Sequence, residues 1–302
     1  LLASGVVATT AIRLAGSAAQ QAAWLPKLAA AQAIATLAVD EGGKHRPQQL
    51  ATTARADDAG WVLDGAKSFV LDGHVADLLV VAARVGEAGT GLFLVDARAP
   101  GVAIERTVMV DAHNAARVRL QGVRVGADAI LGTPETGAAT LAATLDAGRC
   151  AAAGELLGLA DEVFARTMDY IKQRKQFGKL IGEFQGLQHR AAALYADLEI
   201  SRAALIKAQQ ALDADSTTAG QAVAVAKARA GRTVTVDPHT FVETSSYSRQ
   251  GVDALTRAVG VDPIVVGSDR PYGTPHRTDL GEAARIAFTQ TNPYRLLTGE
   301  RP

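Results

Sequence analysis

The chain has 302 residues, of which 48% are hydrophobic, and its 31 basic and 31 acidic residues give a formal net charge of zero. This length predicts about two domains, each with a sizeable core. The balanced charge gives no reason to expect nucleic acid or an anionic membrane surface as a partner. The single cysteine, Cys150, cannot form an internal disulfide, which favours a reducing, cytoplasmic setting. No apolar run approaches the roughly 18 residues of a membrane span.

Residues 1–33 are predicted to be helical, because this stretch is rich in alanine. Pro26, within the segment Trp24–Lys27, predicts a break, since proline lacks the N–H that a hydrogen bond inside a helix needs. The first residue is Leu1, which leaves the true start of the protein open.

Residues 34–131 show the pattern of short β-strands. Apolar runs such as Leu78–Val81 and Leu92–Val95 are separated by turn-forming segments, among them Asp58–Gly60 and Asp72–Gly73. Several short strands at this spacing predict a β-barrel or a β-sandwich.

Residues 135–232 change to helical character. Apolar residues recur three to seven positions apart, which places each set on one face of a helix: Leu156, Leu159, Val163 and Tyr170, then Leu187, Leu194, Leu198 and Leu205. A polar break at Asp213–Thr218 precedes another alanine-rich helix. Three helices with short connections predict a bundle.

Residues 233–302 change character again, and we place a boundary near Arg232. Short apolar segments alternate with predicted helices at 251–259 and 280–288, an order typical of α/β structure. The predicted strands are Val234–Val236, Phe241–Glu243 and Ile264–Val266. The chain as a whole is therefore predicted to be α+β, with a few N-terminal helices, a β-barrel or sandwich, a helical bundle and a short α/β tail.

The most specific motif is Arg174–Lys179, followed by Phe184 and Gln185, between two predicted long helices. It resembles the signature of the acyl-CoA dehydrogenase family of FAD enzymes. The resemblance covers roughly residues 20–230 and includes three further segments: Trp24–Leu28, Trp61–Lys67 and Leu145–Arg149. It implies that the N-terminal helical domain is truncated, with only its last helix or two in residues 1–33.

The resemblance implies an FAD site shared between subunits, and hence a homo-oligomer, either a dimer or a tetramer. Arg174 would grip the pyrophosphate, because a guanidinium binds it in a bidentate manner. Phe177 would pack against the adenine, and Gln185 would bond to the pyrophosphate or ribitol. Phe69 and Leu71 match positions on the flavin face, and Arg149 matches an arginine near the acyl-CoA substrate. Taken alone, Arg174 is equally compatible with a solvated charge at a helix end, and Phe177 with a core residue.

Residues that the full dehydrogenase reaction needs are missing. The family's base is usually a glutamate late in the bundle, beyond Arg232 where the resemblance ends, or in a minority a glutamate at the position matched by Ala147. The catalytic residue is therefore unknown. At the flavin face, Leu71 cannot donate a hydrogen bond, and Asp40 adds a carboxylate that would disfavour a reduced, anionic flavin. We expect a catalytically incomplete oxidoreductase acting on the CH–CH group of an acyl-CoA, with no readable chain-length preference.

The tail, residues 239–299, resembles the end of a metal-dependent amidohydrolase of the (β/α)₈ type. Asp269 would then be its catalytic aspartate. The six histidines show no HxH or HExxH spacing, so no metal site is predicted. The chain would be chimeric under this interpretation. Two other functions stay open: an amidohydrolase or decarboxylase fragment, and a non-catalytic helical oligomerisation module.

Overall fold

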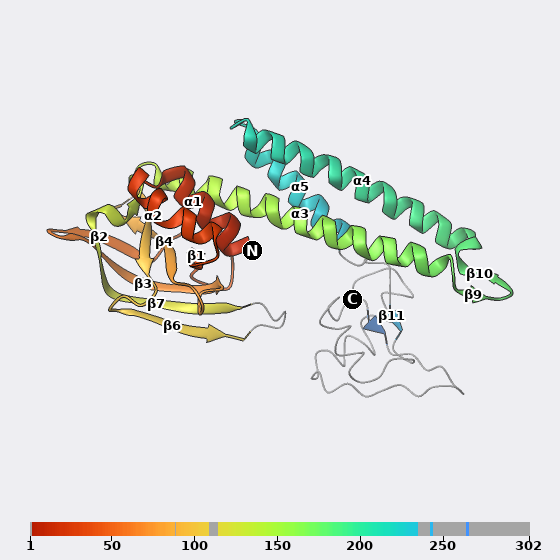
Figure 1. The fold of residues 1–302 in the computed structure, drawn as a ribbon, viewed down its shortest axis with the longest axis horizontal. Helices are drawn as coiled ribbons and strands as arrows, with labels where there is room; N and C mark the ends of the chain where they lie inside the picture. The colour runs from red at the N-terminus through yellow and green to blue at the C-terminus, as the bar shows by residue number, and fades with distance from the viewer. Residues whose placement is uncertain (1, 88, 109–113, 235–241, 244–263, 266–302) are drawn as a thin grey trace. The chain divides into compact units, whose positions relative to one another are not determined.

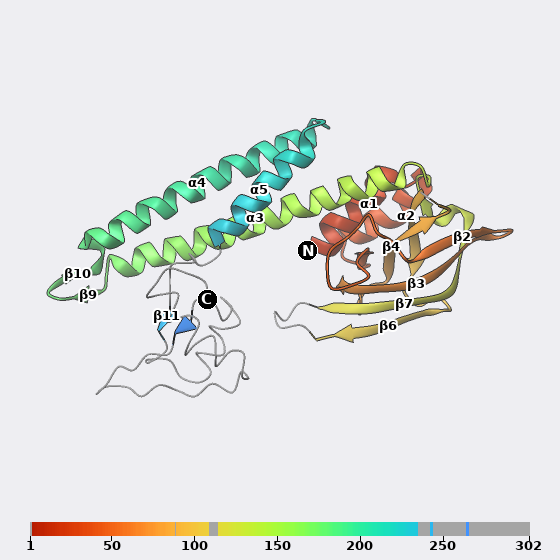
Figure 2. The same ribbon diagram turned by 180° about the vertical axis from the view of Figure 1, so that it is seen from behind.

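The computed structural model describes residues 2–87, 89–108, 114–234, 242–243 and 264–265 (Figures 1 and 2). The chain divides into two compact units, Leu1–Ala230 and Gly231–Pro302, and each is described by itself. In the second unit, β11 (Val242–Glu243) and β12 (Ile264–Val265) pair in parallel. Asp269 and the predicted tail helices lie outside the described residues.

The first unit begins with helices: a π-helix (Leu2–Ala8), α1 (Thr9–Ala15) and α2 (Ala18–Ala29). The break lies before Ser17, whose side chain forms a capping box with Gln20. The predicted break at Pro26 is wrong, because α2 continues through this residue to Ala29. The helix is solvent-exposed at Pro26, so water can satisfy the carbonyl that the missing N–H leaves unpaired.

The β region follows between residues 35 and 131. Its strands are β1 (Ala35–Ala38), β2 (Thr53–Asp57), β3 (Gly60–Leu71), β4 (Leu78–Val85), β5 (Gly89–Asp96), β6 (Val102–Thr107), β7 (Ala115–Gly126) and β8 (Ile130–Leu131). They form one sheet in the order β6-β7-β3-β2-β4-β5-β8, with β1 also paired to β4. Within the described residues β6 and β8 do not pair, so the sheet is open and is not a closed barrel.

Two strands share one edge of β4. β1 runs parallel to its first half, with Ala35 opposite Leu78, and β2 runs parallel to its end, with Thr53 opposite Arg84. On its other side β2 pairs with the first half of β3. The second half of β3 is therefore left beside β1, and this junction forms part of the site described below.

The core lies on both faces of β4, whose residues 78–83 are all buried. Leu79 and Val81 belong to a cluster with other residues of the sheet. Leu78 and Val80 belong to a second cluster, which includes Ile12 of α1 and reaches the start of the long helix described next. The N-terminal helices thus cover one face of the sheet (Figure 1).

The bundle consists of α3 (Gly137–Ile171), α4 (Gln185–Asp213) and α5 (Ala219–Val234). Both ribbon views show α4 alongside α3 (Figures 1 and 2). The helices join through small buried residues, Cys150, Ala208, Val223 and Ala226. Between α3 and α4 lie β9 (Lys175–Gln176), β10 (Lys179–Leu180) and a 3₁₀ turn (Ile181–Glu183). None of the helices in the described part of the chain has the length and apolarity that crossing a membrane requires.

Candidate functional site

The end of β3 presents two apolar side chains to solvent. Phe69 has a φ of 53° and follows Lys67 in a stretch where the β3–β7 register shifts. A positive φ is uncommon for a residue with a side chain, and it turns the local strand direction. Phe69 is 46% exposed and Leu71 is 37% exposed. The backbone carbonyl of Leu71 accepts a hydrogen bond of 2.6 Å from the hydroxyl of Thr36 in β1. These two residues form a solvent-facing apolar platform, which we call the β3 platform.

A loop of residues 41–52 is closed beside this platform by Glu41. Its carboxylate accepts hydrogen bonds from the backbone N–H of Ala51 at 2.6 Å and of Thr52 at 2.9 Å. It also lies 2.7 Å from Nζ of Lys67. Burial alone would raise the pKa of Glu41, but the hydrogen bonds from Lys67, Thr52 and Ala51 outweigh burial and lower this pKa from 4.5 to about 2.

Lys67 is the largest fully buried side chain in the structure's described residues. Its ammonium group donates to Oε1 of Glu41 and, at 3.2 Å, to the carbonyl of Val39. Burial lowers the pKa of Lys67, and the nearby carboxylates of Glu41 and Asp40 oppose that shift. The sequence analysis missed this ion pair. Alternation along the strand gave no signal for it, because Gly65 and Phe69, two positions away on either side of Lys67, are exposed.

Asp40 follows β1 and is fixed to β3 through its backbone. The N–H of Ser68 donates to the carbonyl of Asp40 at 2.7 Å, one residue before Phe69. The Asp40 carboxylate does not stand alone, as the sequence analysis assumed, since its Oδ1 lies 2.8 Å from Nδ1 of His45. The loop closed by Glu41 thus brings the imidazole of His45 to the Asp40 carboxylate.

The second group of predicted residues lies at the turn between α3 and α4. Phe177 is 91% exposed and has a φ of 54°, so the alternative that it is a core residue is wrong. Arg174 and Gln185 are also exposed. Within the described residues, the guanidinium of Arg174 makes no hydrogen bond or ion pair, while its carbonyl accepts from the N–H of Ile181 at 2.8 Å. The turn therefore presents an unpaired guanidinium, that of Arg174, and an exposed aromatic ring, that of Phe177, three residues apart in the sequence. We call Arg174, Phe177 and Gln185 the hairpin group.

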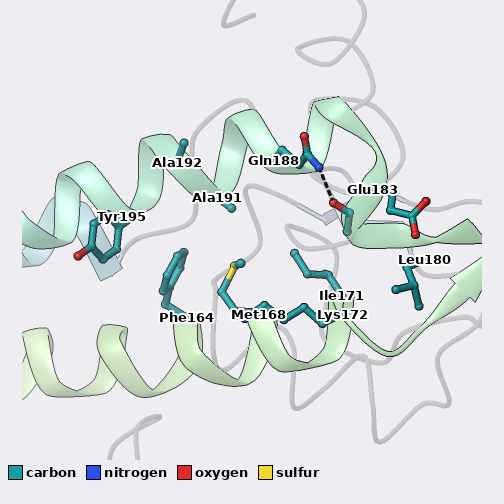
Figure 3. A pocket seen from close by; sticks show the side chains of 11 residues that line it. Phe164, Met168, Ile171, Lys172, Leu180, Glu183, Gln188, Ala191, Ala192 and Tyr195 are labelled. Atoms are coloured by element: carbon teal, nitrogen blue, oxygen red, sulfur yellow. Dashed lines mark hydrogen bonds between the residues drawn. The ribbon is translucent and has the colours of Figure 1, made fainter.

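A pocket of about 580 Å³ opens between α3 and α4 next to this turn (Figure 3). Phe164 and Met168 project from α3 toward Ala191 and Tyr195 of α4. Its complete lining is Phe164, Met168, Ile171, Lys172, Leu180, Gly182, Glu183, Gln188, Ala191, Ala192 and Tyr195. The predicted helical faces nearby are solvent-exposed in the single chain, as shown by Leu159, Val163, Tyr170 and Leu194. This surface is apolar and has no cover within the described residues.

The first half of α3 carries Arg149, whose guanidinium lies 2.7 Å from Oδ1 of Asp146. Ala147 and the adjacent Gly148 have no side chain that can take a proton, and the carboxylate on the other side of Ala147, Asp146, is paired with Arg149. The described residues contain no group of three or more metal-binding side chains.

The β3 platform and the hairpin group are not brought together within one chain. α3 has 35 residues and is therefore about 52 Å long. Its first residue, Gly137, abuts Thr90 of β5, and the hairpin group follows its last turn. Figure 1 shows the β9–β10 turn at the end of α3 that points away from the sheet.

The described part of the chain thus combines an eight-stranded sheet with a bundle of long helices. Two family models match the chain: the acyl-CoA dehydrogenase middle domain over residues 35–123, and the acyl-CoA dehydrogenase C-terminal domain over residues 135–243. The chain belongs to the acyl-CoA dehydrogenase family.

Individual relatives agree with this assignment. The short/branched chain specific acyl-CoA dehydrogenase of Bos taurus is 33% identical over 208 residues, covering 66% of this chain and 48% of that protein. FadE12 of Mycobacterium tuberculosis is 28% identical over 296 residues, covering 95% of this chain and 72% of that protein. The structure of a glutaryl-CoA dehydrogenase from Mycobacterium smegmatis in complex with FADH2 superposes with a TM-score of 0.71 at 26% identity, covering 77% of this chain and 61% of that one. The chain spans about half the length of the bovine relative.

The comparisons give no support to an amidohydrolase-like tail or to a chimeric chain. The match to the C-terminal domain extends to residue 243, past the boundary placed near Arg232. The alignment with FadE12 covers 95% of this chain, so it also extends into the segment 239–299.

Proposed function

We propose that this chain binds FAD between two subunits and is an acyl-CoA dehydrogenase-like oxidoreductase, acting on the CH–CH group of an acyl-CoA thioester. The observation that carries the proposal is the separation of the β3 platform and the hairpin group by the length of α3. The side chains of both groups are exposed to solvent in the single chain, as two halves of a shared site would be. FAD would supply the hydride-accepting chemistry that the side chains themselves lack.

The residues present fit the nucleotide part of FAD well. The unpaired guanidinium of Arg174 suits a pyrophosphate, and the exposed ring of Phe177 suits stacking on a base. The fit to the flavin ring is partial. Phe69 offers an exposed aromatic surface, but Leu71 offers no hydrogen bond, and its carbonyl is already bonded to Thr36.

A homo-oligomer follows from the same proposal. The apolar pocket between α3 and α4 and the exposed Val163 and Leu194 are suited to contact a second copy, because a monomer rarely leaves so much apolar surface open. Analytical ultracentrifugation, which measures the mass of the assembly, distinguishes a dimer from a tetramer. We propose a reducing, cytoplasmic setting on the basis of the single buried Cys150.

Turnover is the weaker part of the proposal. The position that the resemblance assigns to a base in the first bundle helix holds Ala147, and the neighbouring Asp146 is paired with Arg149. We therefore expect FAD binding with little or no oxidation of an acyl-CoA by the chain as given. The chain-length preference is left open.

The experiment reconstitutes the full chain with FAD and follows the visible flavin absorption and the dissociation constant. Phe69→Asp and Arg174→Ala, each alone, should weaken FAD binding by about tenfold or more, since one charge-assisted contact contributes roughly 1.5–3 kcal/mol. Arg98→Ala, at a side chain that is 86% exposed on the β region, is the matched control and should leave binding unchanged. A wild-type chain that retains no FAD would overturn the proposal.

Mixing the two weak variants tests the shared site directly. In a mixed dimer one site carries both substitutions and the other carries neither, so about a quarter of all sites should regain full affinity in a random mixture. A site contained within one chain predicts no recovery. Oligomerisation without any FAD binding would instead favour a non-catalytic helical module.

A further inference from the structure

The pair Asp40 and His45 is a feature of this chain that the proposed function does not use. Asp40 is tied to β3 by the 2.7 Å bond from Ser68, so its carboxylate lies at the edge of the β3 platform. Its Oδ1 lies 2.8 Å from Nδ1 of His45, and the two side chains are 27% and 45% exposed. A polar pair that reaches solvent at this place would border any ring stacked on the platform.

The loop that carries His45 is held in place by Glu41. Three donors converge on the Glu41 carboxylate, namely Lys67 and the N–H groups of Ala51 and Thr52, and they close the loop at both ends. The position of His45 relative to Asp40 is therefore set by the fold, although His45 itself lies on an exposed segment.

Two other cations of this region have partners of their own. Lys67 is bound to Glu41, and Nη1 of Arg46 donates to Oε1 of Gln49 at 3.3 Å. The charge of Asp40 also acts on Lys67, but among the described residues His45 is the one that makes a side-chain hydrogen bond to the Asp40 carboxylate.

We propose that His45 is a positioning residue whose hydrogen bond to Asp40 screens this carboxylate from the flavin and thereby sets the reduction potential of the bound FAD. The inference rests on the proposed FAD site. A carboxylate that is hydrogen-bonded to an imidazole repels a flavin that has gained negative charge on reduction less than a carboxylate without this partner does. His45 thus offsets the disadvantage that Asp40 brings to this site.

The test measures the midpoint potential of the bound flavin and the dissociation constants of FAD in the reconstituted full chain. His45→Gln should lower the potential, and each tenfold loss of affinity for reduced over oxidised flavin corresponds to about 30 mV. His45→Lys keeps a positive charge and should stay near the wild-type potential. Adding Asp40→Asn to His45→Gln should restore the potential, because the carboxylate that repels the reduced flavin is then absent.

An equal potential in the wild type and in His45→Gln would overturn the inference. It would mean that the substitution weakens the binding of both redox states equally, which would assign His45 a purely structural role. The circular dichroism spectrum and urea unfolding of each variant verify folding. If the wild type binds no FAD, the proposed function itself fails. If FAD binds and the potentials do not differ, only the role of His45 fails.

Discussion

The ammonium group of Lys67 lies 2.7 Å from Oε1 of Glu41, and the lysine side chain is fully buried while the glutamate is 16% exposed. This contact joins the middle of β3 to the start of the loop that carries His45. Because an unpaired buried charge is strongly unfavourable, each residue depends on the other. The same contact therefore contributes to stability and fixes the start of this loop against β3.

Glu41→Gln should lower the free energy of unfolding by about 3–5 kcal/mol, because it leaves the ammonium of Lys67 buried without a counter-charge. The control is Glu162→Gln on α3. Glu162 also lies 2.7 Å from its partner, Arg166, but their side chains are 60% and 80% exposed. Glu162→Gln should lower the free energy of unfolding by no more than about 0.5 kcal/mol. Urea titrations measure both values, and equal losses would contradict the role of burial.

The free energy of unfolding should decrease at low pH, because the contribution of Glu41 is lost when its carboxylate is protonated. Its pKa is lowered from 4.5 to about 2 in the folded state, so the carboxylate is stabilised by folding. The contribution of Glu41 is complete above pH 4.5 and is lost as the pH falls toward about 2. Urea unfolding at a series of pH values should show this decline in the wild type. In Glu41→Gln the decline should be smaller, and an unchanged profile would argue against the assignment.

Truncation of two phenylalanines should have very different effects on the free energy of unfolding. Phe177→Ala should change the free energy of unfolding by less than about 0.5 kcal/mol, because its ring is 91% exposed. It should nevertheless weaken FAD binding. Phe93→Ala removes a fully buried ring of the sheet core that stacks edge-on with Trp61, and should cost about 3–5 kcal/mol. If Phe177→Ala destabilised an isolated monomer, the exposed position of this ring would be wrong.

Two glycines of α3 should also behave differently. A Cβ at Gly137 would collide with the carbonyl of Thr90 in β5, so Gly137→Ala should destabilise the protein by about 1–3 kcal/mol. At Gly158 a Cβ would meet nothing within 4 Å, and Gly158→Ala should stabilise the helix by about 0.5–1 kcal/mol. Thermal or urea unfolding compares the two. A neutral Gly137→Ala would mean that α3 does not start against β5 as described.

Several parts of the fold could be predicted because they depend on neighbours in the sequence. The strands near Leu78–Val81 and Leu92–Val95 and the polar break at Asp213–Thr218 appear at the expected places. Pro26 shows the limit of such reasoning, since an exposed helix can tolerate a missing hydrogen bond where water replaces it.

The sequence by itself determined the family resemblance, the helical and β segments, and the residue types of the hairpin group, because these follow from short-range spacing. Only the tertiary structure decided that Lys67 is buried against Glu41, that His45 is hydrogen-bonded to Asp40, and that Phe177 faces solvent. Lys67 and Glu41 are 26 positions apart, and strand pairing brings them together. Spacing along a chain fixes which face of an element a residue occupies, whereas packing between elements fixes what that face meets.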